Sequence, residues 1–383
     1  MNRLRFQLPL FVIIRTVFNT AYRMVYPFLP VLARGLGVDI QAMSLGMTAR
    51  ALMGGLGPFA ASLADSRGRK FGMLFGLSFF TLGTAIVVFW PTYPVFVISL
   101  ILTTLGKYGF DPSMQAFLGD RIPYERRGRA LAITEVGWSA AFIVGVPLMG
   151  FLIARAGWMA PFPLLTLLAL LSMIGLFVLL PADRNDPQEA ANLFNNFRAV
   201  LIYLPALAGL AVGFFTTTAN ELVNFIFGVW LEDSFGLQIT ALGAASAVIG
   251  LSEFGGEGLV AIFVDKLGKP RAVGMGLLAN CLAVLLLPWL GRSTPGALVG
   301  LFLFYITFEF TLVSIIPMMT EVMPKKRATL MAFNIAAFSL GRALGAPLAP
   351  FLYHFSFHVV TLGAVAFNLL ALLALGCLLK EHR

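Results

Sequence analysis

Long apolar runs separated by short polar connections are the dominant pattern along this 383-residue chain. A helix of ~20 apolar residues spans the hydrocarbon core of a bilayer and satisfies its backbone polar groups internally. The pattern predicts an all-α integral membrane protein with twelve spanning helices, joined by connections too short for a further domain. The predicted spans are 8–33, 42–64, 71–90, 94–118, 129–154, 158–181, 201–231, 240–264, 271–290, 297–319, 328–352 and 358–379.

The composition agrees with lipid as the solvent of the chain. Hydrophobic residues make up 59% of the sequence and the mean hydropathy is +0.88, more apolar surface than one soluble core could bury. The net charge of +9 comes from basic residues that gather at alternate connections. The positive-inside rule then places both termini and the central linker in the cytoplasm. Topology explains the charge, so we expect the lipid bilayer as a partner and no nucleic acid.

A repeat divides the chain. A shift of 200 residues aligns ADSRGRKFGM with VDKLGKPRAV, and the same shift aligns GVPLMGFL with GAPLAPFL. One offset in two distant windows indicates a duplicated six-helix unit. The predicted domains are an N-terminal bundle over 1–180, a cytoplasmic linker over 181–200 and a C-terminal bundle over 201–383.

The loop after the second predicted span, SLADSRGRK, resembles the G-x-L-A-D-R-x-G-R-K signature of the major facilitator superfamily. The resemblance covers essentially the whole chain, with two departures from the signature, at Ala61 and Ser66. It implies two six-helix bundles, transport by alternating access, and a cytoplasmic gate at this loop. The implied gating residues are Asp65, Gly68, Arg69, Lys70 and Asp120, with Asp265 and Gly268 in the second half.

The charges of this loop suggest how a gate would work. The Asp65 carboxylate can meet the positive N-terminus of a helix in the other half, and the basic residues beside it can pair with Asp120 or Glu125. Such contacts would hold one conformation. The alternative is a loop that only sets the topology.

The fifth predicted span contains GWSAAFIVGVPLMGFL, which resembles the antiporter motif of exporters in this family. Gly145 and Gly150 permit close helix approach, and Pro147 removes a backbone hydrogen bond. Plain helix packing is the alternative, because the repeat carries a similar stretch at Gly345 and Pro347, where no exporter motif is expected.

Charged residues inside the predicted spans say most about mechanism, because each is costly unless it faces protein, water or a partner. They occur in predicted helices 1, 2, 4, 5, 7, 8, 10 and 11, which is the pattern that a central polar cavity requires. The set is Arg15, Arg23, Arg50, Lys107, Asp111, Glu135, Glu221, Glu253, Glu257, Glu309 and Arg342.

The second half carries four of these carboxylates against one base. Burial disfavours the charged form of a carboxylate, so such groups can hold and release protons near neutral pH. Glu221, Glu253 and Glu309 are therefore predicted to include the proton-coupling site, with Asp111 and Glu135 as further candidates. For Asp111 the favoured interpretation is an internal ion pair with Lys107, four residues earlier on the helix. Arg342 is expected to pair with Glu309 or Glu253.

Candidate substrate contacts lie in the first and seventh predicted spans. Arg23 sits among Asn19 and Tyr26 and could hold an anionic or hydrogen-bonding group. The seventh span mixes phenylalanines with Asn220 and Asn224, which would suit a partly apolar substrate. Lys107 and Arg342 complete the predicted substrate-binding set.

The sequence lacks a Ser/His/Asp set, a paired thiol motif and a nucleotide-binding loop, so we expect no enzyme activity, cofactor or metal. An ion gradient or the substrate's own gradient must then drive transport. We predict a proton-coupled exporter of small amphipathic or lipophilic compounds, monomeric in a prokaryotic plasma (cytoplasmic) membrane. One alternative is an importer or facilitator of a nutrient or lipid-like anion bound through Arg23. Another is a transporter-like sensor that binds its ligand without moving it.

Overall fold

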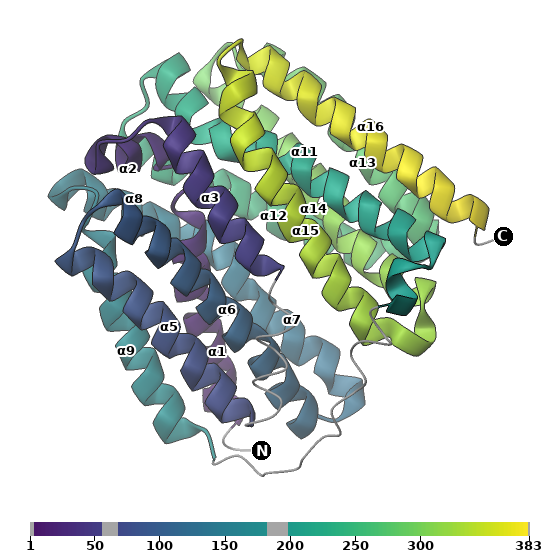
Figure 1. Ribbon diagram of the computed structural model, residues 1–383, viewed down its shortest axis with the longest axis horizontal. Helices are drawn as coiled ribbons and strands as arrows, with labels where there is room; N and C mark the ends of the chain where they lie inside the picture. Colours follow the sequence, from purple (N-terminus) through teal and green to yellow (C-terminus); the bar gives the residue numbers. More distant parts are fainter. Residues whose placement is uncertain (1–3, 56–67, 182–197, 382–383) are drawn as a thin grey trace. The chain divides into compact units, whose positions relative to one another are not determined.

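The computed structural model describes residues 4–55, 68–181 and 198–381, and every regular element in these ranges is a helix (Figure 1). The described residues form two compact units. Of the described residues, unit 1 contains 4–39, 68–181 and 238–247, and unit 2 contains 40–55, 198–237 and 248–381.

Unit 1 is built around α1, which packs against α7, and around α5, which packs along α6 and α9 (Figure 1). Gly76 and Gly106 allow the close approach of α5 and α6, since a Cβ at Gly76 would lie 2.5 Å from the Gly106 carbonyl oxygen. The helices are α1 (Leu4–Arg23), α2 (Leu29–Leu36), α5 (Arg69–Phe89), α6 (Tyr93–Arg121), α7 (Tyr124–Ala140), a π-helix (Ala141–Gly145), α8 (Val146–Ala156) and α9 (Pro161–Leu179).

Unit 2 is built around α11, which packs against α15 and α16, while α13 packs along α14 (Figure 1). Helix α3 packs on α15, and α12 begins in unit 1 and continues in unit 2. The helices are α3 (Ile40–Gly54), α11 (Leu204–Phe235), α12 (Ile239–Leu267), α13 (Lys269–Leu290), α14 (Thr294–Val322), a 3-10 turn (Pro324–Lys326), α15 (Arg327–Tyr353) and α16 (Phe357–Glu381).

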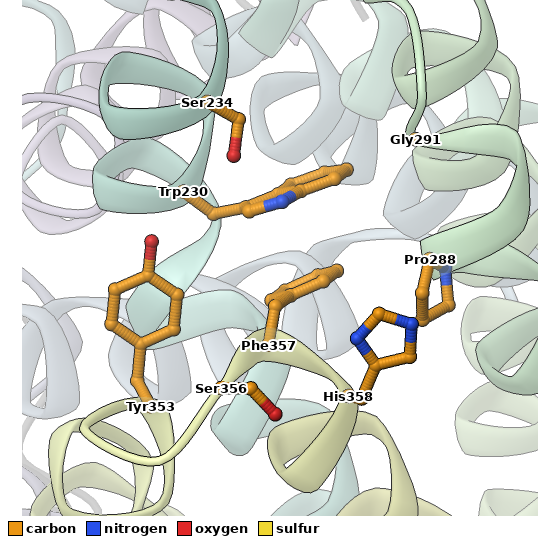
Figure 2. Close-up of a pocket in the computed structure, with 8 residues that line it drawn as sticks. All are labelled: Trp230, Ser234, Pro288, Gly291, Tyr353, Ser356, Phe357 and His358. Carbon is orange, nitrogen blue, oxygen red and sulfur yellow. The ribbon is translucent and has the colours of Figure 1, made fainter.

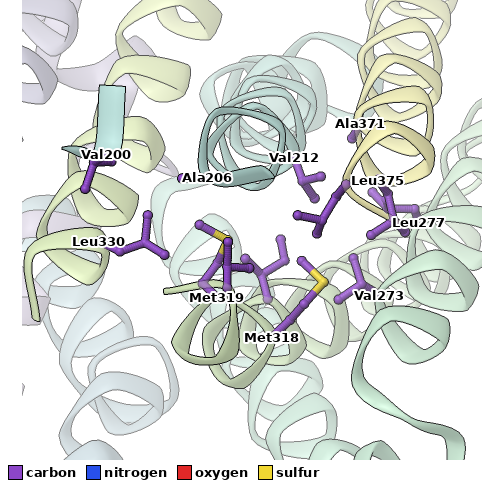
Figure 3. Close-up of a cluster of buried hydrophobic side chains, with 13 residues drawn as sticks. Val200, Ala206, Val212, Val273, Leu277, Met318, Met319, Leu330, Ala371 and Leu375 are labelled. Atoms are coloured by element: carbon purple, nitrogen blue, oxygen red, sulfur yellow. The ribbon is translucent and has the colours of Figure 1, made fainter. Parts of the chain in front are cut away.

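A cluster of buried apolar side chains joins five of these helices, α11, α13, α14, α15 and α16 (Figure 3). Lipid tails are as apolar as the side chains themselves, so such a cluster stabilises the bundle through close packing and dispersion. Its members include Val212 of α11, Val273 of α13, Met318 and Met319 of α14, and Leu375 of α16.

The first predicted span is not one helix, and the prediction of an unbroken helix over 8–33 is wrong. Helix α1 ends at Arg23, residues 24–28 form turns, and α2 begins at Leu29. Pro27 has no N–H to donate and disfavours the helical conformation of the residue before it. Pro30 lies in the first turn of α2, where the missing N–H costs nothing.

The fifth predicted span, 129–154, is divided by the π-helix Ala141–Gly145. Pro147 follows two residues later, in the first turn of α8. Because proline lacks the N–H of a regular helix and its ring crowds the preceding turn, a wider π turn relieves the conflict. The span was therefore predicted in the right place but without its change of helix type.

Ten helices within the described ranges are long and apolar enough to cross a membrane. The difference from twelve arises at the first two predicted spans. The first is interrupted as described, and the second, 42–64, extends into residues 56–64, which lie outside the described part of the chain. The number twelve and the orientation of the termini stay predictions.

Candidate functional site

Four charged side chains of α1, α6 and α7 form one connected network in unit 1. Arg15 Nη1 lies 2.6 Å from Glu135 Oε1, and Arg15 Nε lies 3.4 Å from Asp111 Oδ1. Lys107 Nζ is 2.6 Å from Asp111 Oδ2 and donates to Asn19 Oδ1 at 2.8 Å. Two bases and two acids therefore compensate one another, as burial in an apolar helix bundle requires.

Close contact between α1 and α7 holds this network together. A Cβ at Gly137 would lie 2.8 Å from Arg15 Cβ and 3.0 Å from the carbonyl oxygen of Val12. Asn19 Nδ2 donates to the Gly137 carbonyl at 3.2 Å. A larger residue at position 137 would thus push Arg15 and Asn19 away from their partners.

Arg23 lies one helical turn beyond Asn19, and aromatic rings hold it. Its Cζ is 4.1 Å from the centroid of the Trp138 ring and 3.6 Å from that of Phe142, and its Nη1 donates to the Trp138 carbonyl at 3.2 Å. A guanidinium over aromatic faces gains cation–π energy, more so when it is desolvated. Trp138 and Phe142 were missed by the sequence analysis, because they lie on other elements than Arg23 and the sequence does not show that they face it. Tyr26 is buried in the turn that follows α1.

Three predicted proton carriers are buried in unit 2. Glu221, Glu253 and Glu309 are 2%, 3% and 5% exposed. A Cβ at Gly256 of α12 would lie 2.9 Å from Glu309 Cβ on α14. A Cβ at Gly345 of α15 would lie 2.6 Å from Glu221 Cβ on α11. Two of the three carboxylates thus project from points where a glycine of a neighbouring helix allows close approach.

Of the basic residues predicted to lie inside spans, unit 2 holds Arg342 of α15 and Arg50 of α3. Arg50 is 2% exposed and enters this unit because α3 packs on α15. The sequence had assigned Arg50 to the other half, so among the charges predicted inside spans this unit holds two arginines against four carboxylates. The pairing of Arg342 with Glu309 or Glu253 stays a prediction.

Polar residues of α11 connect to α14. Tyr305 Oη donates to Asn224 Oδ1 at 2.7 Å, and Asn224 Nδ2 donates to Glu221 Oε2 at 3.4 Å. Asn220 is 4% exposed, and its Nδ2 has no hydrogen-bond acceptor among the described residues. Tyr305 was missed by the sequence analysis, although it lies four residues before Glu309 and so on the same side of α14.

The loop motif is described in part, since Asp65 lies outside the described residues. Gly68 precedes α5 with φ of 104°, and Gly268 precedes α13 with φ of 82°. Residues with a Cβ rarely adopt a positive φ of this size, which explains why glycine occupies the equivalent position in both repeats. Asp265, two residues before the end of α12, is exposed.

Ion pairs join the helices that follow these glycines to their neighbours. Arg69 Nε lies 3.3 Å from Asp120 Oδ2, and Lys269 pairs with Glu321 at nearly the equivalent place in unit 2. The side chain of Glu125, the other expected partner, is outside the described part. Lys70 Nζ instead donates to the carbonyls of Phe177 and Leu180 at 2.9 and 2.8 Å, and so ties α5 to the end of α9.

The glycines of the fifth predicted span mark close contacts within unit 1. A Cβ at Gly145 would collide with the Thr20 hydroxyl of α1, and one at Gly150 would lie 2.8 Å from Phe28 Cζ. Pro147 Cα lies 3.3 Å from the Cβ position of Gly243, at the start of α12. All three motif residues therefore have a packing role.

A cavity of about 450 Å³ opens elsewhere in unit 2, where the end of α11 meets the turn between α15 and α16 (Figure 2). The stacked rings of Trp230 and Phe357 form its centre, with centroids 4.1 Å apart. Tyr353 lines the cavity and donates to Asp233 Oδ2 at 3.0 Å. No residue predicted to bind substrate or protons is among the lining residues.

Comparison with known proteins gives one consistent result. The sequence profile of the Major Facilitator Superfamily matches residues 11–212 and 209–383. The chain is 26% identical over 356 residues to the uncharacterized MFS-type transporter YceJ of Bacillus subtilis (strain 168), which covers 91% of this chain and 90% of that protein. It is 24% identical over 343 residues to multidrug resistance protein 2 of the same organism, with 85% and 83% covered.

The fold also matches solved structures. A bacterial homologue of the human lysosomal transporter Spinster, in an inward-facing and unoccupied conformation, superposes with a TM-score of 0.78 at 15% identity. The match covers 99% of this chain and 98% of that chain. At this identity the likeness establishes the fold.

Proposed function

Because this chain belongs to the Major Facilitator Superfamily, a family of non-enzymatic membrane transporters that work by alternating access, we propose that it exports small amphipathic or lipophilic compounds in exchange for protons. The observation that carries the proposal is the burial of Glu221, Glu253 and Glu309 within apolar helices. A buried carboxylate can be kept neutral by taking up a proton, and a proton taken up on one side can be released on the other.

The balance of charge favours unit 2 as the site of proton coupling. In unit 1 the carboxylates of Asp111 and Glu135 are already compensated by Arg15 and Lys107. In unit 2 the four carboxylates of the predicted spans outnumber the two arginines of those spans, and protonation is one way to neutralise the excess negative charge. We therefore assign the proton to the glutamates of unit 2 ahead of Asp111 and Glu135.

Export of partly apolar compounds fits the polar groups along α11. The Asn220 amide is buried and offers a donor that takes no acceptor within the described residues, so a substrate carbonyl or ether oxygen could accept from it. Asn224 lies one turn further along the same helix. The similarity to a protein named for multidrug resistance agrees with this substrate class.

We further propose the complete topology of twelve spans with both termini in the cytoplasm. The chain would be a monomer in a prokaryotic plasma membrane, with bundles over 1–180 and 201–383 joined by the linker 181–200. The paired arrangement of Arg69 with Asp120 and of Lys269 with Glu321 supports the duplication. The loop at Asp65, Gly68, Arg69 and Lys70, with Asp265 and Gly268, is proposed as the cytoplasmic gate.

An importer or facilitator that binds an anion through Arg23 is the second candidate. Its basis is weaker in this structure, because Trp138 and Phe142 lie against the Arg23 guanidinium and the Trp138 carbonyl accepts one of its N–H groups. A sensor that binds its ligand without transport is distinguished by saturable binding without flux.

The test uses purified protein in liposomes with an acidic interior and an internal pH dye. Lipophilic cations, amphipathic anions and sugars are added in turn. We expect lipophilic compounds to trigger proton efflux, with loss of the response in Glu309→Gln or Glu221→Gln. Asp233→Asn, an exposed acid at the end of α11, is the matched control and should respond as the parent protein does. Saturable uptake without proton movement would contradict the proposal and favour the facilitator.

A further inference from the structure

We infer that Asn224 and Tyr305 form a relay that reports the protonation of Glu221 on α11 to the neighbouring helix α14. The inference rests on the proposed proton coupling at Glu221. The hydrogen bonds run from Tyr305 Oη to Asn224 Oδ1 and from Asn224 Nδ2 to Glu221 Oε2, over 2.7 and 3.4 Å. The three side chains are 2%, 9% and 2% exposed in the order Tyr305, Asn224, Glu221.

A side-chain amide has a donor N–H₂ group and an acceptor oxygen. The orientation of the Asn224 amide therefore depends on whether Glu221 is ionised or protonated. An ionised carboxylate only accepts hydrogen bonds, so it requires the amide N–H₂ group to face it. A protonated carboxyl carries an O–H donor, which is better satisfied by the amide oxygen. Arrival of the proton therefore favours a half-turn of the Asn224 amide about its terminal bond.

Tyr305 is suited to follow that half-turn, because a phenol hydroxyl both donates and accepts. In the structure Tyr305 donates to Asn224 Oδ1, which is the arrangement that suits an ionised Glu221. With Glu221 protonated and the amide turned, the amide N–H₂ donates to Tyr305 Oη, and the phenol proton must turn to another acceptor. One proton gained at Glu221 thus reverses the direction of the hydrogen bond between Asn224 and Tyr305 of α14. No covalent bond in Asn224 or Tyr305 is broken.

Tyr305 lies near a second buried carboxylate on α14. Glu309 lies one turn further along α14 on the same side of the helix. The other charged groups on helices around Glu221 are Arg342 on α15, which packs on α11, and Arg50 on α3, which packs on α15. Glu253 lies on α12, and the ionisable residues of α16 lie only near its ends, at His358, Lys380 and Glu381. The relay therefore runs from Glu221 to a residue one helical turn from Glu309, a second carboxylate proposed to carry protons.

The arrangement makes a directional prediction. Donation by Tyr305 to the amide oxygen keeps the amide N–H₂ facing Glu221 and so favours the ionised carboxylate. Tyr305→Phe keeps the ring and removes the hydroxyl, so Glu221 should hold its proton to a higher pH. The expected shift is about 0.5 to 1 pH unit, which corresponds to one neutral hydrogen bond. Asn224→Leu removes the amide itself and should shift the midpoint further in the same direction.

The measurement is an infrared titration of purified protein in lipid nanodiscs, without substrate. The carboxyl band that disappears in Glu221→Gln reports Glu221, and its midpoint is compared in the parent protein, Tyr305→Phe and Asn224→Leu. Tyr353→Phe is the matched control, because it removes another hydroxyl of unit 2, the one that donates to Asp233. Its midpoint should equal that of the parent.

Two outcomes would overturn the relay, and they separate it from the proposed function. A Glu221 band whose midpoint is the same in Tyr305→Phe and Asn224→Leu would overturn the relay alone and leave proton coupling at Glu221 intact. The absence of any band that depends on Glu221 would overturn both the relay and the assignment of the proton to this residue. Circular dichroism of each variant verifies that a shift does not arise from unfolding.

Discussion

Gly345 of α15 faces Glu221 of α11 so closely that a Cβ at the glycine would lie 2.6 Å from Glu221 Cβ and 3.0 Å from the Thr218 carbonyl oxygen. Glu221 therefore leaves its helix at a point where α11 and α15 are in close contact. A glycine here sets where Glu221 can point, and its role can be tested without changing any charged group.

We expect Gly345→Val to lower both stability and transport. The added side chain has no space between α11 and α15, and overpacking of this kind costs about 1–3 kcal/mol. The helices must separate, which displaces Glu221 from its place against α15. Thermal unfolding in detergent and proton efflux from liposomes measure the two effects.

Gly376→Ala is the control for this change, since a Cβ at Gly376 of α16 would meet nothing within 4 Å among the described residues. Its stability should be equal to that of the parent or slightly higher, because alanine restricts the unfolded chain. Equal unfolding temperatures for Gly345→Val and the parent protein would contradict the packing argument.

Arg15→Met should be the most damaging single change in the network of unit 1. It leaves Asp111, whose side chain is 16% exposed, without one of its two bases, and loss of one partner of a buried pair costs about 3–5 kcal/mol. Glu135→Gln should cost less, because the Glu135 side chain is 42% exposed and its interaction with Arg15 is partly screened. Unfolding free energies of both variants and of the double variant give the coupling. A Glu135→Gln variant less stable than Arg15→Met would refute this order.

The aromatic contacts of Arg23 should appear as a measurable coupling. We expect a double-mutant cycle of Arg23→Met and Trp138→Leu to give an interaction free energy of about 1–2 kcal/mol, in the range of desolvated cation–π pairs. Strictly additive effects on stability would show that the ring and the guanidinium do not interact. Phe151, whose ring centroid is 4.9 Å from the exposed Arg155, offers a comparison pair in which the coupling should be smaller.

The proposed gate is tested by Asp65→Asn, which keeps the size of the side chain and removes its charge. We expect the balance between inward-open and outward-open conformations to shift, because the carboxylate can no longer stabilise one of them. Single cysteines placed on either side report the shift through their accessibility to membrane-impermeant reagents. Unchanged accessibility on both sides, together with unchanged transport, would leave this loop with topology as its only role.

The positions of most helices can be predicted from the long apolar runs of the chain. The contacts between helices cannot be predicted in this way. Uniformly apolar runs locate a helix along the chain but do not fix its rotation about its axis. The ion pair of Lys107 with Asp111 was expected because both residues lie on one helix at i and i+4. The contacts of Arg23 with Trp138 and of Tyr305 with Asn224 join different helices, so their existence depends on rotation and tilt that periodicity leaves open.

The local interruptions of the helices could not be predicted from the sequence pattern either. Pro27 and Pro147 were visible in the sequence, yet prolines within membrane helices are often accommodated because neighbouring groups satisfy the freed carbonyls. In this protein Pro27 follows the end of α1, whereas Pro147 follows a π turn in a helix that continues. The surrounding packing decides between these outcomes, and the residue alone does not.

The π-helix at Ala141–Gly145 has a consequence for how this span tolerates changes in length. A π turn takes up one residue more than an α turn between the same two points of the helix. The extra residue is absorbed locally, so Gly137 on one side and Gly150 on the other each keep the face that they need. Removing a single residue within 141–145 should convert the turn to a regular helix and leave both faces aligned. The same deletion a few residues away would rotate one glycine off its partner.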